Sequence, residues 1–354
     1  MKAAKESFLE AFNGNSKAEQ LKYGSLACFL IGTVGDQVLT KKATLAANFP
    51  AALTLLTALA GVILFPIIVY GAVWLGHVKK KHIWVEWWKP CVIAVCFAVH
   101  HALLNAGAGG HQMPGIVTLV LVKFVILFSM LLSMPQWSLG LVYQQNHWLG
   151  LVVLALGTLL TLSTQFETIE SSIGSKFFKC MLIVLSTVPL AGAFTFVEVY
   201  LKVQNKELFT VALWMWVCMV QFFASLLLVP LSIVLSGHPL GQMGVRLGDG
   251  MLCYTMGITP QNLGSSDTDL DCSQASVCWW GALIFALAFN LAMPVSTRYG
   301  GATLMWFVRA MSVPLAGIIF SSRIMGQFAT PMTWSQFFGL ALVTAGVMLF
   351  NSKE

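Results

Sequence analysis

The sequence predicts an all-α integral membrane protein with ten transmembrane helices. Of its 354 residues, 57% are hydrophobic and only 10% are charged, whereas a soluble domain carries about 25% charged residues. Apolar runs of about 20 residues, the length that a helix needs to cross a bilayer, recur along the chain. Glycine, proline or polar clusters separate these runs, so each run is interpreted as one span.

The predicted elements follow from these runs in chain order. Residues 1–22 are polar and mixed in charge, and the pattern over 8–20 indicates a weak amphipathic helix at the membrane interface. The spans are then 23–41, 51–76, 88–106, 114–134, 148–166, 177–201, 208–235, 279–297, 301–321 and 333–350. No cleavable signal precedes the first span, so we expect that span to act as an uncleaved signal anchor.

The placement of the basic residues predicts the orientation in the membrane. The formal charge of +6 is not a nucleic-acid footprint, because the basic residues cluster in short loops. With ten spans both termini lie on one side, and that side collects twelve Lys and Arg residues against six on the other. The strongest single group is Lys79-Lys80-Lys81. The excess predicts cytosolic termini and places the cysteine-containing loop 236–278 in a lumen or outside the cell.

The ten spans divide into two halves, 23–166 and 177–350. Gly115-Ile-Val-Thr-Leu-Val-Leu-Val-Lys123 in the fourth span resembles Gly301-Ala-Thr-Leu-Met-Trp-Phe-Val-Arg309 in the ninth. These spans are equivalent if the chain is two five-helix repeats. An odd number of spans per repeat inverts the second one, which is the plan of many secondary transporters with a central substrate site. The whole chain is expected to be one membrane domain.

Asp36 is the first charged residue within a predicted span. Insertion of such a residue into a bilayer costs about 2.5–3.5 kcal/mol, so its presence there needs an explanation. It lies deep in the first span beside Gln37, and Gly32 and Gly35 allow another helix to approach closely. One interpretation is a structural pair with the basic residues at 41–42. The other is an acid that faces a cavity.

Glu198, late in the sixth span, also has two interpretations. It pairs with Lys202 one turn later, or it is a protonatable carboxylate that lines a pathway. Lys123 and Arg309 lie within the fourth and ninth spans. They serve either as counter-ions for the two buried acids or as ligands for an anionic group.

His100 and His101 are the remaining ionisable pair within a span, and histidine titrates near neutral pH. A hydrogen-bonded packing role is the commoner explanation, and no acidic partner stands at metal-ligand spacing, so we expect no metal site. Two similar proline motifs, Thr187-Val-Pro189 and Ser312-Val-Pro314, predict kinks that act through packing or as hinges. No motif of an ATPase, hydrolase or metalloprotease is present, so the chain is not expected to be an enzyme.

The C-terminal half resembles the chloroquine-resistance-transporter-like (CRT-like) family of the drug/metabolite transporter superfamily. The resemblance is carried by Gly250-Met-Leu-Cys-Tyr-Thr-Met-Gly, Cys272, Cys278, Ala288-Phe-Asn290, Ser296-Thr-Arg-Tyr and Ser312-Val-Pro. It implies the ten-helix drug/metabolite transporter fold, with a central cavity and alternating access. Founding members export peptides, amino acids or cationic compounds with protons from an acidic digestive vacuole. Plant relatives move glutathione-type thiols across plastid envelopes.

The resemblance also implies that the loop cysteines form a bridge. The best-known relatives have four such cysteines, whereas this chain has Cys253, Cys272 and Cys278. We predict the bridge Cys253–Cys278, because it ties the start of the loop to the first turn of the eighth span. The alternative is Cys253–Cys272. A lumenal face permits thiol oxidation.

Three hypotheses of function follow. The first is a proton-coupled secondary transporter that exports amino acids, short peptides or cationic metabolites from a vacuolar or endolysosomal lumen to the cytosol. The second is a plastid-envelope transporter of glutathione or γ-glutamylcysteine, and the third is a non-transporting receptor or scaffold. The expected partners are a small solute, protons and lipid. The protein is expected to be a monomer and to have no cofactor. The residues expected along the pathway are Asp36, Gln37, His100, Lys123, Glu198, Asn290 and Arg309.

Overall fold

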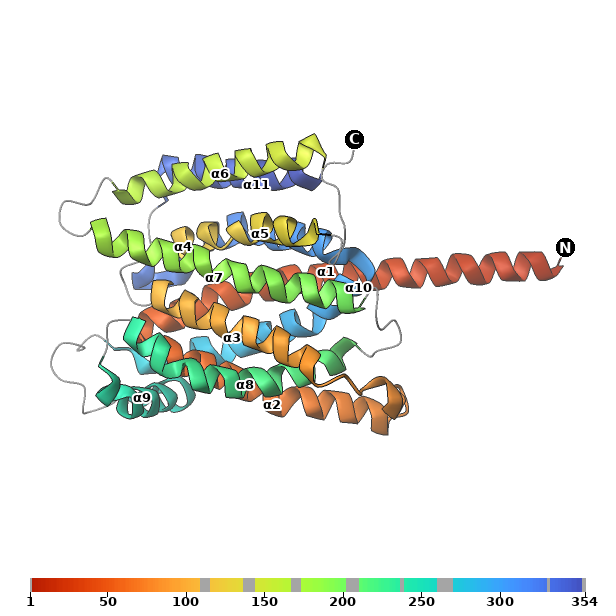
Figure 1. Cartoon of the computed structure of the whole chain (residues 1–354), viewed down its shortest axis with the longest axis horizontal. Coiled ribbons are helices and arrows are strands. Elements are labelled where there is room, and N and C mark those ends of the chain that lie inside the picture. The colour runs from red at the N-terminus through yellow and green to blue at the C-terminus, as the bar shows by residue number, and fades with distance from the viewer. Residues whose placement is uncertain are drawn as a thin grey trace.

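The structure, a computed structural model, describes residues 2–108, 115–135, 144–166, 173–201, 210–235, 239–259, 270–329 and 332–351. Within these residues every regular element is a helix, and the helices pack side by side (Figure 1). The helices are α1 (Lys2–Ala47), α2 (Pro50–Trp74), η1 (Lys80–His82), α3 (Trp88–Ala108), α4 (Gly115–Leu121), α5 (Phe124–Ser133), α6 (Gln145–Phe166), α7 (Ile173–Val199), α8 (Thr210–Leu235), η3 (Leu240–Gln242), α9 (Met243–Met256), α10 (Cys272–Ser321), η4 (Arg323–Phe328) and α11 (Trp334–Asn351).

The structure is that of an all-α membrane protein. Among the described residues, five helical stretches are long and apolar enough to cross a bilayer. They are Pro50–Trp74, Trp88–Ala108, Phe177–Val199, Val211–Leu235 and Cys272–Met293. Large apolar side chains such as Ile67, Leu227 and Ile284 are exposed on the outside of these helices. Such a surface suits lipid as the solvent, because every backbone polar group of a helix is satisfied within the helix.

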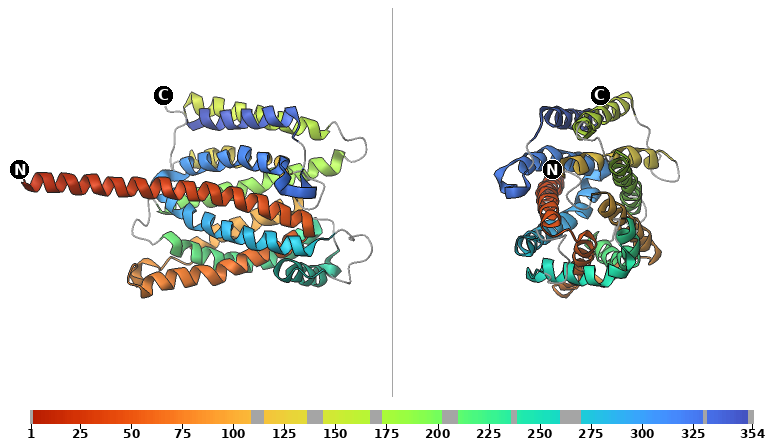
Figure 2. Two further views of the ribbon diagram at one scale, coloured as in Figure 1. Left: turned by 180° about the vertical axis from the view of Figure 1, so that it is seen from behind. Right: turned by 90° about the vertical axis from the view of Figure 1, so that its left-hand side faces the viewer.

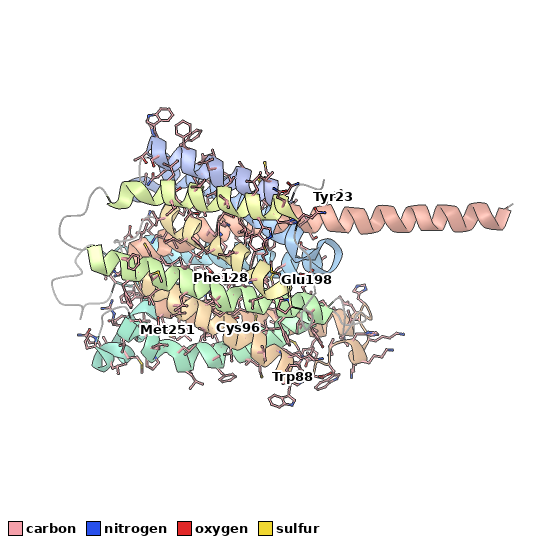
Figure 3. The ribbon with its side chains drawn as sticks, turned by 45° about the horizontal axis from the view of Figure 1, so that its top comes forward. Tyr23, Trp88, Cys96, Phe128, Glu198 and Met251 are labelled. Atoms are coloured by element: carbon pink, nitrogen blue, oxygen red, sulfur yellow. A yellow bond between two sulfur atoms is a disulfide. The ribbon has the colours of Figure 1, made fainter. Side chains whose placement is uncertain are left out.

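The helix α1 is longer than the sequence predicted. Its 46 residues run without a break from Lys2 to Ala47, so residues 8–20 continue into the first apolar run and do not form a separate helix. At 1.5 Å per residue the helix is about 69 Å long, about twice the thickness of a hydrocarbon core. Figure 2 shows its N-terminal part beyond the bundle, and Tyr23 lies where it leaves (Figure 3).

The predicted eighth and ninth spans form one continuous helix, α10, of 50 residues. Its two halves nevertheless lie at different levels of the bundle (Figure 2). Contacts with α1 define the path. The backbone N–H of Asp271 donates to Ala46 O at 3.0 Å, and Ser296 Oγ donates to Ser25 Oγ at 3.1 Å. Ser312 then lies 3.3 Å from Gln37. The helix α10 therefore runs antiparallel to α1 as far as Ser296, changes direction between Ser296 and Ser312, and returns along α1.

The glycines of the first span were predicted to let another helix approach closely, and α10 is the helix that does so. A Cβ atom on Gly32 would lie 2.8 Å from the backbone nitrogen of Phe289, and one on Gly35 would overlap the ring of Phe285. Neither position therefore accepts a side chain. The fourth predicted span differs from expectation, because it is divided into α4 and α5 between Leu121 and Phe124.

The helices α6 and α11 form a pair at one edge of the bundle (Figure 1). Glycines let their backbones touch. A Cβ atom on Gly157 would lie 2.7 Å from Gly339 O, and one on Gly346 would lie 2.7 Å from Gly150 O. Each helix thus carries two glycines seven residues apart, which is two turns of helix. Small residues of this kind are the usual means of close helix packing in membranes.

The cysteine bridge joins Cys253 to Cys272, with an S–S distance of 2.03 Å. This is the alternative pairing, and the predicted Cys253–Cys278 bridge is wrong. Cys272 begins α10 directly beside the end of α9, whereas Cys278 lies six residues further, about 9 Å along the helix and on another face. Cys278 is a buried free thiol.

Part of the predicted loop 236–278 is also helical, since it contains α9, which ends at Gly257 with a φ of 71°. A left-handed φ of this kind favours glycine. Asp267 and Asp269 of this loop lie outside the described residues. Asp271 instead caps α10 by accepting a hydrogen bond from Gln274 N at 2.9 Å. The bridge and α9 lie at one end of the bundle, and the two termini and η1 lie at the other (Figure 1).

Candidate functional site

A cavity of about 330 Å³ lies in the middle of the bundle. Residues of α1, α2, α3, α4, α7, α8 and α10 line it. Five of the seven predicted pathway residues are in its wall: Asp36, Gln37, His100, Asn290 and Arg309. The other two, Lys123 and Glu198, are not among the lining residues in the part of the chain that the structure describes. The cavity is therefore the candidate site.

Asp36 lines the cavity from the C-terminal third of α1. The hydroxyl of Thr40, one turn later, donates to Asp36 Oδ1 at 3.2 Å. Lys41 was a candidate partner for this carboxylate, but its Nζ donates to the carbonyl of Ala108 at 3.2 Å, at the end of α3. Lys41 also lines the cavity. Asp36 and Arg309 interact electrostatically, so the wall contains charges of both signs.

Arg309 reaches the cavity from the returning half of α10. Its guanidinium carbon lies 5.8 Å from the ring centres of both Phe194 and Phe289, and aromatic faces attract a cation at this range. Lys123 supports the same segment from outside the cavity. Its buried ammonium group donates to Arg309 O at 2.8 Å. Lys123 thus binds the backbone of α10, which places Arg309 but leaves Lys123 away from the cavity wall.

Two amides of the wall are held by neighbouring helices. The indole Nε1 of Trp214 in α8 donates to Asn290 Oδ1 at 2.9 Å. Ser312 Oγ lies 3.3 Å from Gln37 Oε1 and donates to Arg309 O at 2.6 Å. Asn290 and Gln37 therefore have fixed positions on either side of the α1–α10 contact.

The two histidines are adjacent in the wall, with ring centres 5.1 Å apart. His100 Nδ1 lies within hydrogen-bonding distance, 2.8 Å, of the Ser186 carbonyl in α7. Within the described residues, no group of three His, Cys, Asp or Glu side chains is arranged to hold a metal ion. The geometry gives His100 a role in packing α3 against α7.

Glu198 lies near the end of α7, away from the cavity, and is 7% exposed (Figure 3). Its predicted partner Lys202 lies outside the described residues. Two residues along, Tyr200 is buried and carries the ammonium group of Lys89 4.5 Å above its ring. Lys89 also pairs with Glu86 at 3.1 Å. Glu198 is therefore part of a buried region near the end of the bundle that holds η1.

Residues that the prediction missed form the rest of the polar wall. They are Thr33, Thr40, Lys41, Thr44, Thr54, Thr57, Asn105 and Thr118. The members on α1 recur every three or four residues with Asp36, and that polar stripe in an apolar span was a usable signal. Asn105 Nδ2 donates to Thr54 Oγ1 at 2.8 Å and to Pro50 O at 3.4 Å, so α2 and α3 close this side of the cavity together.

The two proline motifs share a local hydrogen bond. Thr187 Oγ1 donates to Val184 O at 2.6 Å, and Ser312 Oγ donates to Arg309 O at 2.6 Å. In both cases the hydroxyl stands two residues before the proline and binds the carbonyl three residues back. Both bonds lie in the helical turn that precedes the proline. Both turns lie beside the cavity, since Leu190 and Arg309 line it.

These features define an all-helical integral membrane protein with a cavity between its helices that contains charged and polar side chains. Sequence comparison specifies the family. The chain belongs to the CRT-like (chloroquine-resistance transporter-like) family, whose profile matches residues 23–350. The resemblance predicted from the C-terminal half is thereby confirmed.

A chloroquine resistance transporter of Toxoplasma gondii is 28% identical over 255 residues, which are 69% of this chain and 28% of that protein. The chain thus spans less than a third of the length of that relative. A crystal structure of another protein is similar with a TM-score of 0.54 at 14% sequence identity, over 95% of this chain and 97% of that one. At this identity the likeness concerns the fold alone.

Proposed function

We propose that the chain is a secondary active transporter of small organic solutes and that the central cavity is its substrate site. The single observation that carries this proposal is a cavity of about 330 Å³ between apolar helices whose wall contains both a carboxylate, Asp36, and a guanidinium, Arg309. Buried charges in a membrane protein mark substrate and ion pathways. A volume at the lower end of the range for small-molecule sites suits an amino acid or a short peptide.

The proposal includes ten spans in two inverted five-helix repeats that alternate access to the cavity. The reversal of α10 supports separate eighth and ninth crossings, since its two ends both lie beside α1 near the α9 end of the bundle. The mutual glycine contacts of α6 and α11, the fifth helix of each proposed repeat, support their equivalence. Both proline turns, at Pro189 and Pro314, lie in the second proposed repeat.

We further propose export from an acidic vacuolar or endolysosomal lumen to the cytosol, with protons. Asp36 is the proposed proton-binding group in the cavity, and Glu198 is a second proposed site outside it. Two observations support the orientation. Lys80 and Lys81 of η1 lie at the same end as the termini (Figure 1), and basic residues favour the cytosol. The disulfide lies at the opposite end, which fits an oxidising lumen.

The test is uptake by vesicles that contain the purified full chain. Radiolabelled amino acids and short peptides are offered with and without an imposed pH gradient. We expect uptake to rise when the gradient drives protons in the direction of the solute. Uptake that is saturable but indifferent to the gradient contradicts the proton coupling, and the absence of saturable uptake of any of these solutes contradicts the transport function.

A further inference from the structure

Asn290 offers hydrogen-bond donors to the cavity, because its oxygen is already engaged. Trp214 Nε1 donates to Asn290 Oδ1 at 2.9 Å. An indole nitrogen can only donate, so this bond decides which end of the amide is oxygen. Asn290 lines the cavity, and among the described residues its Nδ2 group has no hydrogen-bond partner. The two N–H groups on Nδ2 therefore remain for a bound solute.

Arg309 lines the same cavity as this amide. The ring of Phe289, the residue before Asn290, is centred 5.8 Å from Arg309 Cζ. The Arg309 carbonyl is bound by Lys123 at 2.8 Å, which fixes the backbone from which the guanidinium projects. A guanidinium presents its N–H groups in a planar fork that matches a carboxylate. Asn290 and Arg309 thus both contribute hydrogen-bond donors to the wall of the cavity.

Acceptors lie elsewhere in the wall. Asp36 uses Oδ1 for the hydroxyl of Thr40, which leaves its second oxygen as an acceptor. Asn105 spends its N–H groups on the Pro50 carbonyl and the Thr54 hydroxyl, so its Oδ1 is also an acceptor. A solute with an ammonium group and a carboxylate therefore finds separate partners for each.

The charge balance of the wall favours a negatively charged solute. Its carboxylate, ammonium, guanidinium and imidazole side chains are those of Asp36, Lys41, His100, His101 and Arg309. With neutral histidines, two cations face one carboxylate. An uncompensated charge in a water-poor interior is costly, so a solute that brings an additional negative charge is stabilised over one that brings a positive charge.

We propose that Asn290 and Arg309 form a carboxylate-binding subsite and that the cavity selects acidic solutes, those with more carboxylates than ammonium groups. The inference rests on the proposed transport function for the solute's arrival and release. It narrows the solutes of that proposal to acidic amino acids and acidic short peptides and removes cationic metabolites. Asp36 binds the ammonium group of such a solute.

The test compares solutes of one size and different charge. The purified full chain is offered L-glutamate, L-glutamine and L-lysine, and the dipeptides Ala-Glu, Ala-Gln and Ala-Lys. Binding is measured by thermal stabilisation in detergent, and transport by counterflow in vesicles. We expect the acidic member of at least one series to bind and exchange about tenfold better than the neutral member, as a charge-assisted hydrogen bond provides. Equal or better binding of the neutral or basic members in both series overturns the inference.

Variants then assign the selectivity to the subsite. Asn290→Asp keeps the shape of the side chain but replaces its donors by a carboxylate, so acidic solutes lose about tenfold or more in affinity while basic ones do not. Arg309→Gln acts in the same direction, and Arg309→Lys retains part of the preference. A general defect of the variants would weaken the binding of acidic, neutral and basic solutes equally, and such a result overturns the subsite. Gln242→Glu, on exposed η3, is the matched control.

The two proposals fail differently. If no solute crosses the membrane but acidic solutes still bind through Asn290 and Arg309, transport is wrong and the subsite stands. If solutes cross the membrane under a pH gradient without preference for acidic members, transport stands and the subsite is wrong.

Discussion

Replacement of Gly157 by alanine tests how α6 and α11 are held together. A Cβ atom at this position would lie 2.7 Å from both Gly339 O and Val343 N. Both atoms belong to the backbone, so no side chain can move aside. Because ordinary carbon contacts begin near 3.5 Å, the helices must separate by roughly 0.8 Å. Overpacking of this kind costs about 1–3 kcal/mol.

Gly71→Ala is the matched control for this substitution. Gly71 lies in α2, and a Cβ atom there meets nothing within 4 Å. Both substitutions gain up to about 1 kcal/mol in helix propensity, so their difference isolates the packing cost. We expect Gly157→Ala to unfold at a temperature roughly 2 to 10 °C below that of Gly71→Ala. Gly346→Ala is expected to behave like Gly157→Ala, since its Cβ would meet the backbone of α6.

The assay is thermal unfolding of the purified variants in one detergent, followed by tryptophan fluorescence. Solute binding provides an independent readout, because residues of α6 and α11 are not in the described wall of the cavity. We expect binding at low temperature to be unchanged in both variants. A Gly157→Ala protein that unfolds at or above the temperature of Gly71→Ala refutes the close helix contact.

Two further predictions concern protons and thiols. Asp36→Asn is expected to abolish the acceleration of uptake by a pH gradient, and Glu86→Gln, an exposed carboxylate outside the cavity, should retain the acceleration. Loss of coupling in both variants, or in neither, contradicts the role of Asp36. Alkylation of the denatured, non-reduced chain followed by peptide mapping should leave Cys253 and Cys272 unmodified and label Cys278. A map in which Cys278 is protected and Cys272 is labelled contradicts the bridge.

The helices of the bundle were predictable where apolar length alone decides the structure. The second and third predicted spans, 51–76 and 88–106, agree with α2 and α3 to within two residues, because a polar or turn-forming cluster bounds each run. Features that depend on tertiary contacts were not predictable. The break between α4 and α5 lies at Lys123, whose ammonium group binds Arg309 O in α10, and an apolar pattern does not record such a contact between helices.

The site shows the same division. Asp36 and Arg309 were predicted to be functional because a charged residue within an apolar span is energetically costly. Phe194 and Trp214 were missed, since an aromatic residue in an apolar span looks like ordinary packing. Only the fold brings the ring of Phe194 to Arg309 and the indole of Trp214 to Asn290.

Lys123 connects two irregular points of the bundle. It stands at the break between α4 and α5, and its ammonium group binds Arg309 O, five residues before Pro314. Irregular backbone within a membrane is tolerated only where protein covers it, and here one hydrogen bond joins a helix break to a proline turn. A bend of α10 at Pro314 therefore acts on α4 and α5 as well as on Arg309. In the proposed transport cycle, this bond couples a change in the position of the guanidinium to a movement of the helices beside it.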